Sequence, residues 1–357
     1  MLGLPGAANA ATVAVTDPNG LSYQADDANV AAGATVTGYT GTDTALVIPA
    51  TVVINGVTYA VTSIAEGAFS QLFSYSGPAL TSVVIPDSVT TIEDYAFLEQ
   101  NSLTSITLPD GLTKIGNNEF EGDPLGGHLT IPAHVTEISG NAFAQTQLTS
   151  VTFPDSLTII DGSAFQDDNL GSVVIPASVN EIDSLAFEGN PGLTSVMFEG
   201  AAPVINPAGN LPSLGATAGL VVSYLWAHDA AQQTGGFTSP TWQGYNTREL
   251  VTTTFNANGF GTAPAPVETA SGSVVAQPAD PTASGEAFIG WYTTAALTTK
   301  VNFADPVTAD QTIYAGWERL ATTGVSVSPL DAAPGVAALA LGGLLLALSK
   351  RRRRIRA

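Results

Sequence analysis

The hydrophobic positions of residues 80–187 follow one frame that occurs five times. Residues 80–97 read LTSVVIPDSVTTIEDYAF, and residues 148–165 read LTSVTFPDSLTIIDGSAF. In every copy a proline lies 11 residues before a phenylalanine, and an isoleucine lies 5 residues before it. The phenylalanines are Phe97, Phe120, Phe143, Phe165 and Phe187, spaced by 22 or 23 residues. Such fixed offsets predict a solenoid with one turn per unit.

Each unit begins with a short stretch of alternating polarity. Leu148, Val151 and Phe153 are apolar, whereas Ser150 and Thr152 are polar, which is the pattern of a short strand with one buried face. The proline that follows ends the strand, because it has no N–H to donate to a ladder. One turn buries too little apolar surface to offset its ordering entropy, so we expect the turns to fold by stacking on one another.

The frame L-x-x-[VI]-x-[IL]-P-x-x-[VL]-x-x-I-x-x-x-A-F resembles the BspA-like leucine-rich repeat of bacterial surface proteins. With its flanking caps the resemblance covers residues 12–250. It implies a secreted or wall-displayed solenoid of the kind often used for adhesion, and it implies no particular ligand. Within the first cap, the Asn55-Gly56 pair between Val53 and Val57 predicts a β-hairpin.

A different pattern begins at Val251 with VTTTFNANGFGTAPAPV and continues to the Ala315-Gly316-Trp317 sequence. These residues resemble the internalin-type B-repeat, also called the Listeria-Bacteroides repeat, with NGFG in place of the commoner NGG. The resemblance implies a small β-rich module similar to a β-grasp fold. We expect its aromatic residues to form the core or cap of that module rather than a platform for sugars.

The C-terminal segment combines a motif with an apolar run, 332–349, and a basic tail, 350–357. Eighteen apolar residues are enough for a transmembrane helix, and a basic tail is typical of the cytoplasmic side. The order resembles a Gram-positive sorting signal of the LAxTG type read by class E sortases. It implies a sortase and cell-wall peptidoglycan as partners, and cleavage after the threonine that precedes the glycine. The motif residues are Leu320, Ala321, Thr322, Thr323 and Gly324.

The charge balance excludes several classes of partner. The chain has 31 acidic and 10 basic side chains, and six of the basic ones lie between Lys350 and Arg356. The residues before Lys350 therefore carry 4 − 31 = −27 charges, which repel nucleic acid and anionic lipid. The absence of cysteine from the sequence excludes disulfides, thiolate metal sites and a cysteine nucleophile.

The residues that usually carry catalysis form no pattern. His128, His134 and His228 occupy unrelated places, so we expect surface histidines rather than a metal or catalytic site. Acidic pairs such as Asp26-Asp27 lack the spacing of a calcium loop, and neither a GxSxG elbow nor a GxxxxGK[ST] loop occurs. We therefore expect no enzymatic activity, no cofactor and no metal.

The strand register predicts one candidate ligand surface. If the apolar strand positions point inward, the residues between them point outward and stack one per turn, about 4.8 Å apart. We call the two resulting columns the hydroxyl strip. Strand propensity explains threonine and valine there without any ligand. The first column is Ser82, Ser105, His128, Ser150, Ser172 and Ser195, and the second is Val84, Thr107, Thr130, Thr152, Val174 and Met197.

The sequence thus predicts a mainly β chain, with a leucine-rich-repeat solenoid between caps, a β-grasp-like module and a C-terminal transmembrane helix. The expected function is that of a cell-surface-anchored, non-enzymatic protein that binds a host matrix protein or glycan. The alternative is a structural surface spacer without a specific ligand. The segments are 1–11 (remnant of a secretory signal), 12–79 (cap and first repeat), 80–200 (solenoid), 201–250 (second cap), 251–318 (B-repeat module), 319–331 (sorting motif and linker), 332–349 (transmembrane helix) and 350–357 (cytoplasmic tail).

Overall fold

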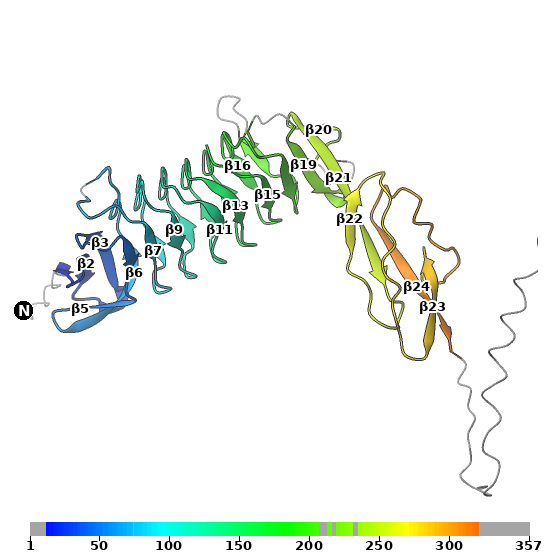
Figure 1. The fold of residues 1–357 in the computed structure, drawn as a ribbon, viewed down its shortest axis with the longest axis horizontal. Helices are drawn as coiled ribbons and strands as arrows, with labels where there is room; N and C mark the ends of the chain where they lie inside the picture. The colour runs from blue at the N-terminus through cyan, green and yellow to red at the C-terminus, as the bar shows by residue number, and fades with distance from the viewer. Residues whose placement is uncertain (1–11, 74, 207–212, 216–218, 231–234, 321–357) are drawn as a thin grey trace, which may run out of the picture.

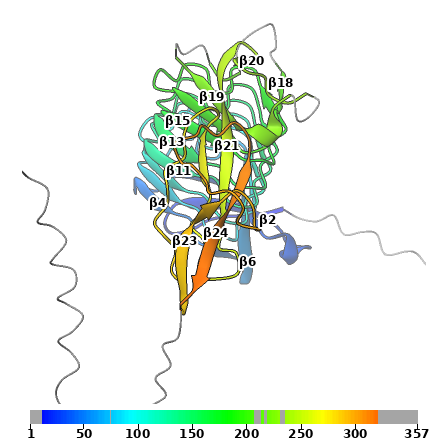
Figure 2. The same ribbon diagram turned by 90° about the vertical axis from the view of Figure 1, so that its right-hand side faces the viewer.

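The molecule is an arc of stacked solenoid turns, each built from short β-strands, with a second β module at its C-terminal end (Figure 1). The alternation of apolar and polar residues in each unit produces the short strands, and the frame's spacing brings equivalent residues together. Seen from the end that carries the C-terminal module, the turns lie one behind another (Figure 2). The computed structural model describes residues 12–73, 75–206, 213–215, 219–230 and 235–320.

The predicted fold class is wrong in one part, the transmembrane helix. Within the described ranges no helix is long and apolar enough to cross a membrane. The helices found there are the three-residue 3-10 helices η1 (Val30–Ala32) and η2 (Trp226–His228). The run 332–349 lies outside the described residues. Length and apolar composition are what a span requires, but they do not by themselves establish one. The supported class is a mainly β solenoid of leucine-rich-repeat type.

The N-terminal cap is a mixed sheet that closes the first end of the solenoid. Its strand order is β1-β2-β3-β6-β5, with β8 paired to β6 on the solenoid side. Asn55 and Gly56 join β5 to β6 with φ values of 52° and 81°, so the predicted hairpin is confirmed with both turn residues left-handed. The strands are β1 (Thr12–Thr16), β2 (Leu21–Asp26), β3 (Ala34–Tyr39), β5 (Thr51–Ile54), β6 (Val57–Ile64) and β8 (Thr91–Ile92).

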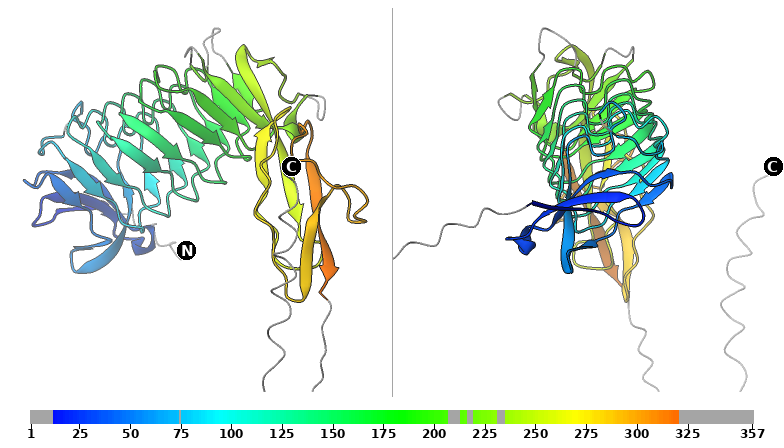
Figure 3. Two further views of the ribbon diagram at one scale, coloured as in Figure 1. Left: turned by 45° about the vertical axis from the view of Figure 1, so that its right-hand side comes forward. Right: turned by 90° about the vertical axis from the view of Figure 1, so that its left-hand side faces the viewer.

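Each turn of the solenoid contributes one strand to a first column and a two- or three-residue strand to a second (Figure 3, left). Neighbouring strands within each column are parallel where they pair. The first column comprises β4 (Ala45–Val47), β7 (Ser82–Val84), β9 (Ser105–Thr107), β11 (Gly127–Thr130), β13 (Leu148–Thr152), β15 (Ser172–Ile175), β17 (Ser195–Phe198) and β19 (Val221–Leu225). The second comprises β8, β10 (Lys114–Ile115), β12 (Glu137–Ile138), β14 (Ile159–Ile160), β16 (Glu181–Asp183) and β18 (Val204–Asn206).

A column of stacked phenylalanine rings runs through the core. Successive rings are nearly parallel, with interplanar angles of 5–14° and centroids 4.9–5.5 Å apart. Every ring is at most 1% exposed. The fixed place of phenylalanine in the sequence frame therefore corresponds to one continuous stack, which ties each turn to the next. Its members are Phe69, Phe97, Phe120, Phe143, Phe165 and Phe187.

The backbone is left-handed two residues before every ring, and two residues after every ring from Phe97 onward, so that the chain reverses tightly there. This conformation costs a residue with a Cβ roughly 1–2 kcal/mol, and glycine and asparagine adopt it most readily. Two residues before the rings, φ lies between 52° and 64° at Gly67, Tyr95, Asn118, Asn141, Ser163 and Leu185. Two residues after them, φ lies between 59° and 78° at Glu99, Gly122, Gln145, Asp167 and Gly189.

A buried polar column accompanies the rings from Phe97 onward, with one member three residues after each of them. Asn190, for example, accepts the N–H of Leu170 at 2.9 Å and donates to the carbonyl of Phe165 at 2.8 Å. These bonds reach back to the preceding turn and satisfy backbone groups that the strands leave unpaired. The hydrophobic frame of the sequence does not predict this column. Its members are Gln100, Asp123, Thr146, Asp168 and Asn190, each at most 2% exposed.

Strand β21 (Tyr245–Asn256) joins the solenoid to the C-terminal module. Its first half is parallel to β19, and its second half is parallel to β24 (Gln311–Arg319). The module is completed by β22 (Val267–Ala270) and β23 (Glu286–Tyr292), which are antiparallel to β21 and β24 respectively. The predicted boundary between residues 250 and 251 thus lies inside one continuous strand, which Figure 1 shows passing from one unit to the other.

The C-terminal module has a small core of its own. Phe255, Trp291 and Ile313 are at most 4% exposed and form this core together with Val275 and Ala315. The ring of Trp291 meets that of Phe255 edge to face at 5.2 Å. Trp291 belongs to the core, as the sequence pattern predicts, and Trp317 is partly buried and packs against it.

Candidate interaction surface

The hydroxyl strip lies along the first strand column. Ser82 pairs with Ser105 in the parallel ladder of β7 and β9, and Val84 pairs with Thr107. None of the residues in the two columns carries a formal charge when its histidine is neutral. Four further pairs of strip residues follow, which are His128 with Ser150, Thr130 with Thr152, Ser172 with Ser195 and Val174 with Met197.

The strip is divided into three paired segments. Among the described strands, β4, β7 and β9 form one sheet, β11 and β13 a second, and β15, β17 and β19 belong to a third. No ladder joins Ser105 to His128 or Ser150 to Ser172 within these sheets. The strip therefore has breaks after β9 and after β13, although β13 and β15 remain in contact.

His128 is the centre of a hydrogen-bonded cluster on the middle segment. Its Nδ1 lies 2.9 Å from Oγ of Ser150, and its Nε2 lies 3.2 Å from Oγ1 of Thr130 and 3.3 Å from Oγ1 of Thr152. All of these groups are at least partly exposed. Three hydroxyls hold the imidazole ring in one orientation, and this order was not foreseen from the sequence.

The two ends of the strip are more apolar than its middle. Val47, in the first strand of the column, is 67% exposed and pairs with Val84, which is 43% exposed. At the other end Val174 is 49% exposed and pairs with Met197. The outward face thus places hydroxyl groups and one imidazole between two aliphatic ends.

Within the described residues no three histidine, aspartate or glutamate side chains gather closely enough to hold a metal ion. His134 is exposed, and its Nδ1 lies 3.0 Å from the carbonyl oxygen of Asp110. Among the described residues, the hydrogen-bond partners of the His128 ring nitrogens are all hydroxyl groups.

Only the first residue of the sorting motif falls within the described ranges. Leu320 is exposed, and its N–H donates to the carbonyl of Gly285 at 2.9 Å, just after the end of β24. Ala321, Thr322, Thr323 and Gly324 lie outside the described residues.

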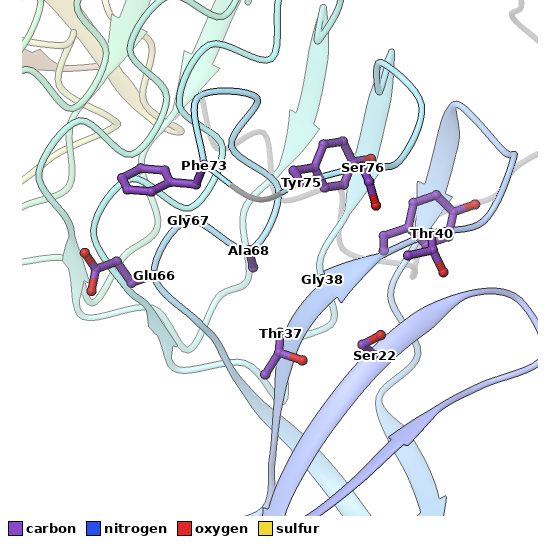
Figure 4. A pocket seen from close by; sticks show the side chains of 11 residues that line it. Ser22, Thr37, Gly38, Thr40, Glu66, Gly67, Ala68, Phe73, Tyr75 and Ser76 are labelled. Carbon is purple, nitrogen blue, oxygen red and sulfur yellow. The ribbon is translucent and has the colours of Figure 1, made fainter.

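A pocket that the sequence analysis missed lies in the N-terminal cap (Figure 4). Its volume is about 390 Å³. One wall comes from the cap strands and includes Thr37 and Thr40, and the other includes Phe73 and Tyr75. The second wall belongs to a unit of extra length, because Phe69 and Phe97 lie 97 − 69 = 28 residues apart instead of 22 or 23. That spacing was the available sequence signal.

Two family models match the chain. The BspA type leucine rich repeat region matches residues 62–194 in six copies, and the Listeria-Bacteroides repeat domain matches residues 252–316. Both predicted repeat types are therefore confirmed, and neither of these two models extends to the sorting motif at residues 320–324. No curated protein matches the chain.

Several solved structures are similar to parts of the chain. A leucine rich cell surface protein from Faecalibacterium prausnitzii is 25% identical over 61% of this chain and 72% of its own, with a TM-score of 0.42. A leucine-rich repeat protein from Bacteroides capillosus is 32% identical over 34% and 85%, with a TM-score of 0.30. The leucine rich repeat protein of T. pallidum is 26% identical over 61% and 89%, with a TM-score of 0.33. Because all three TM-scores are below 0.5, these structures carry no argument, and the assignment of the repeats rests on the family models alone.

Proposed function

We propose that this chain, which carries a BspA-type leucine-rich repeat region and a Listeria-Bacteroides repeat domain, is a cell-surface protein that acts by binding and catalyses no reaction. The contact surface in this proposal is the hydroxyl strip. The ligand is a host matrix protein or a glycan, because an uncharged face rich in hydroxyl groups suits partners that bind through neutral hydrogen bonds and apolar contacts.

The observation that carries the proposal is the outward register of the strip. Five intervals separate Ser82 from Ser195, which gives a face roughly 25 Å long at the usual strand spacing. This face is free of formal charge on a body with a net charge of −27 before Lys350. A contact surface without acidic side chains avoids the repulsion that such a body exerts on acidic partners.

The proposal includes covalent attachment to the cell wall through the sorting motif. A class E sortase would cleave between Thr323 and Gly324 and join the threonine to an amine of peptidoglycan. The support for this step is the order of motif and basic tail in the sequence.

The test of the strip is a pair of charge substitutions. Ser105→Glu with Thr130→Glu is expected to abolish binding to an array of matrix proteins, mucins and glycans, because two carboxylates would have to be desolvated in the contact. The matched control is Thr91→Glu with Thr113→Glu, which adds equal charge at exposed positions, one in β8 and one just before β10 of the second strand column. Circular dichroism should show the same fold in both variants. Binding that survives the first pair would place the contact elsewhere, and an unmodified chain that binds no probe would favour the spacer alternative.

A further inference from the structure

The pocket in the N-terminal cap has the size and construction of a small-ligand site. Its volume of about 390 Å³ lies within the range of roughly 300–1,000 Å³ that ligand pockets occupy. Gly38 lies on β3 beside Thr37, Gly67 and Ala68 lie on the facing segment, and the small size of these three residues leaves the space open (Figure 4). A Cβ added to Gly38 would meet only the carbonyl oxygen of Ala68, at 3.7 Å.

The aromatic wall of the pocket is held in place but not covered. The ring of Phe73 rests on Gly67, where an added Cβ would come within 3.0 Å of it, and lies 5.8 Å from the ring of Tyr95. Phe73 nevertheless remains 51% exposed. Tyr75 is fixed by a 2.8 Å hydrogen bond from its hydroxyl to the carbonyl of Pro78. Burial, and secondarily Tyr39, raises the pKa of Tyr75 above its ordinary value.

Three polar side chains on the pocket lining have no partner of their own. Within the part of the chain that the structure describes, the side chains of Thr37, Glu66 and Ser76 make no hydrogen bond to another residue. They supply two hydroxyl groups, which donate and accept, and one carboxylate, which accepts. Thr40, beside them, donates only a long bond of 3.4 Å to the carbonyl of Gly20.

We propose that this pocket binds a neutral pyranose sugar. A pyranose has an apolar C–H face, which the exposed ring of Phe73 can cover, and a rim of hydroxyl groups, which Thr37, Glu66 and Ser76 can bind. The strongly acidic chain disfavours anionic sugars. The pocket lies on the cap, apart from the hydroxyl strip, so the proposal does not depend on the function proposed for the strip.

The test uses saturation-transfer difference NMR on the full chain with glucose, galactose, mannose and N-acetylglucosamine. At least one of them is expected to give a transfer signal, with a dissociation constant of about 0.1–10 mM. Phe73→Ala should weaken that affinity by roughly two- to tenfold, because it removes the aromatic face. Gly38→Val should abolish binding, because it fills the space between the walls at a residue whose φ is not left-handed.

Leu72→Ala is the matched control, because Leu72 is adjacent to Phe73 and 66% exposed but does not line the pocket. It should bind as the native chain does, and so should the strip variant Ser105→Glu with Thr130→Glu. Because Phe73 is exposed, Phe73→Ala is expected to fold, and it tests the proposal even if Gly38→Val fails to fold. The proposal is overturned if none of the four sugars gives a signal with the native chain, or if Phe73→Ala leaves the affinity unchanged.

Discussion

Thr146 donates a 2.6 Å hydrogen bond from its hydroxyl to Oδ1 of Asp168, whose carboxyl is only 2% exposed. The other carboxyl oxygen, Oδ2, has no partner among the described residues. Burial raises the pKa of Asp168 to about 7, and the hydrogen bond from Thr146 opposes that rise without cancelling it. The folded chain therefore keeps a proton on Asp168 in a pH range where the unfolded chain has released it.

We expect the free energy of unfolding to fall as pH rises. The contribution of Asp168 is fully present below about pH 4, the ordinary pKa of aspartate, and is lost as pH rises through about 7. Burial also raises the pKa of Glu119 and Asp123 well above the usual values, so both groups add to the same trend. Urea titrations at several pH values from 4 to 8 measure the free energy of unfolding. A free energy of unfolding that rises over this range would contradict the raised pKa values of these carboxyl groups.

Asp168→Asn should raise the free energy of unfolding at pH 8 by about 1–3 kcal/mol and change it little at pH 4. Asparagine keeps an acceptor for Thr146 but cannot ionise, and Asn190 already occupies the equivalent place one turn later. The reverse change, Asn190→Asp, is the matched control. It should lower stability at pH 8 and spare it at pH 4.

Phe143→Ala should cost about 3–5 kcal/mol, because it leaves a cavity in the ring column. Phe143 is fully buried and stacks on Phe120 at 5.3 Å and on Phe165 at 5.4 Å. Gln145→Ala is the control, because Gln145 is exposed. Its left-handed backbone, with a φ of 59°, strains alanine and glutamine alike, since both residues carry a Cβ. Thermal unfolding compares the two variants. Equal, small shifts in Tm would show that the ring column contributes no more to stability than an exposed side chain does.

Leu185→Asn should stabilise the solenoid by about 0.5–1 kcal/mol, because asparagine tolerates the left-handed backbone better than leucine does. Leu185 has a φ of 62° two residues before Phe187. Asn141 holds the same place two residues before Phe143, with a φ of 55°. Asn141→Leu should therefore destabilise by a similar amount. Changes of the same sign in both variants, measured by urea denaturation, would contradict a conformational cause.

Thr323→Ala should prevent attachment to the cell wall in a host that expresses a class E sortase, because it alters the residue whose carbonyl the enzyme would attack. Fractionation of the cells measures the amount of chain in the wall. Mass spectrometry of the wall-released native chain should find Thr323 at its C-terminus. A wall-released chain that still contains Val325 would rule out sortase cleavage.

The repeat frame made the core predictable because equivalent residues in a solenoid stack directly. The spacing of the phenylalanines was enough to place Phe97 and Phe120 in one column, and the Asn55-Gly56 pair was enough to place a hairpin.

The left-handed positions and the buried polar column escaped prediction for a different reason. Tyr95 and Leu185 are not turn formers, so the packing of the turn, and not local propensity, sets their backbone. The polar column varies in residue type from Gln100 to Thr146, and only its constant place three residues after each phenylalanine marks it. Thr37 and Phe73 lie on opposite walls of the pocket. The 28-residue spacing marks the longer unit that carries Phe73, but nothing in the sequence places that unit beside Thr37.

Strand β21 has a mechanical consequence for a chain held at its C-terminal end. Tension on the module would run along this strand, and the parallel ladder between Val221–Leu225 and Asn246–Leu250 would resist it in shear. Hydrogen bonds loaded in shear must yield together, whereas bonds pulled from one end open in succession. A flexible hinge would let the module extend before the tension reached any turn of the solenoid. A shared strand instead transmits the tension directly to the last turns of the stack.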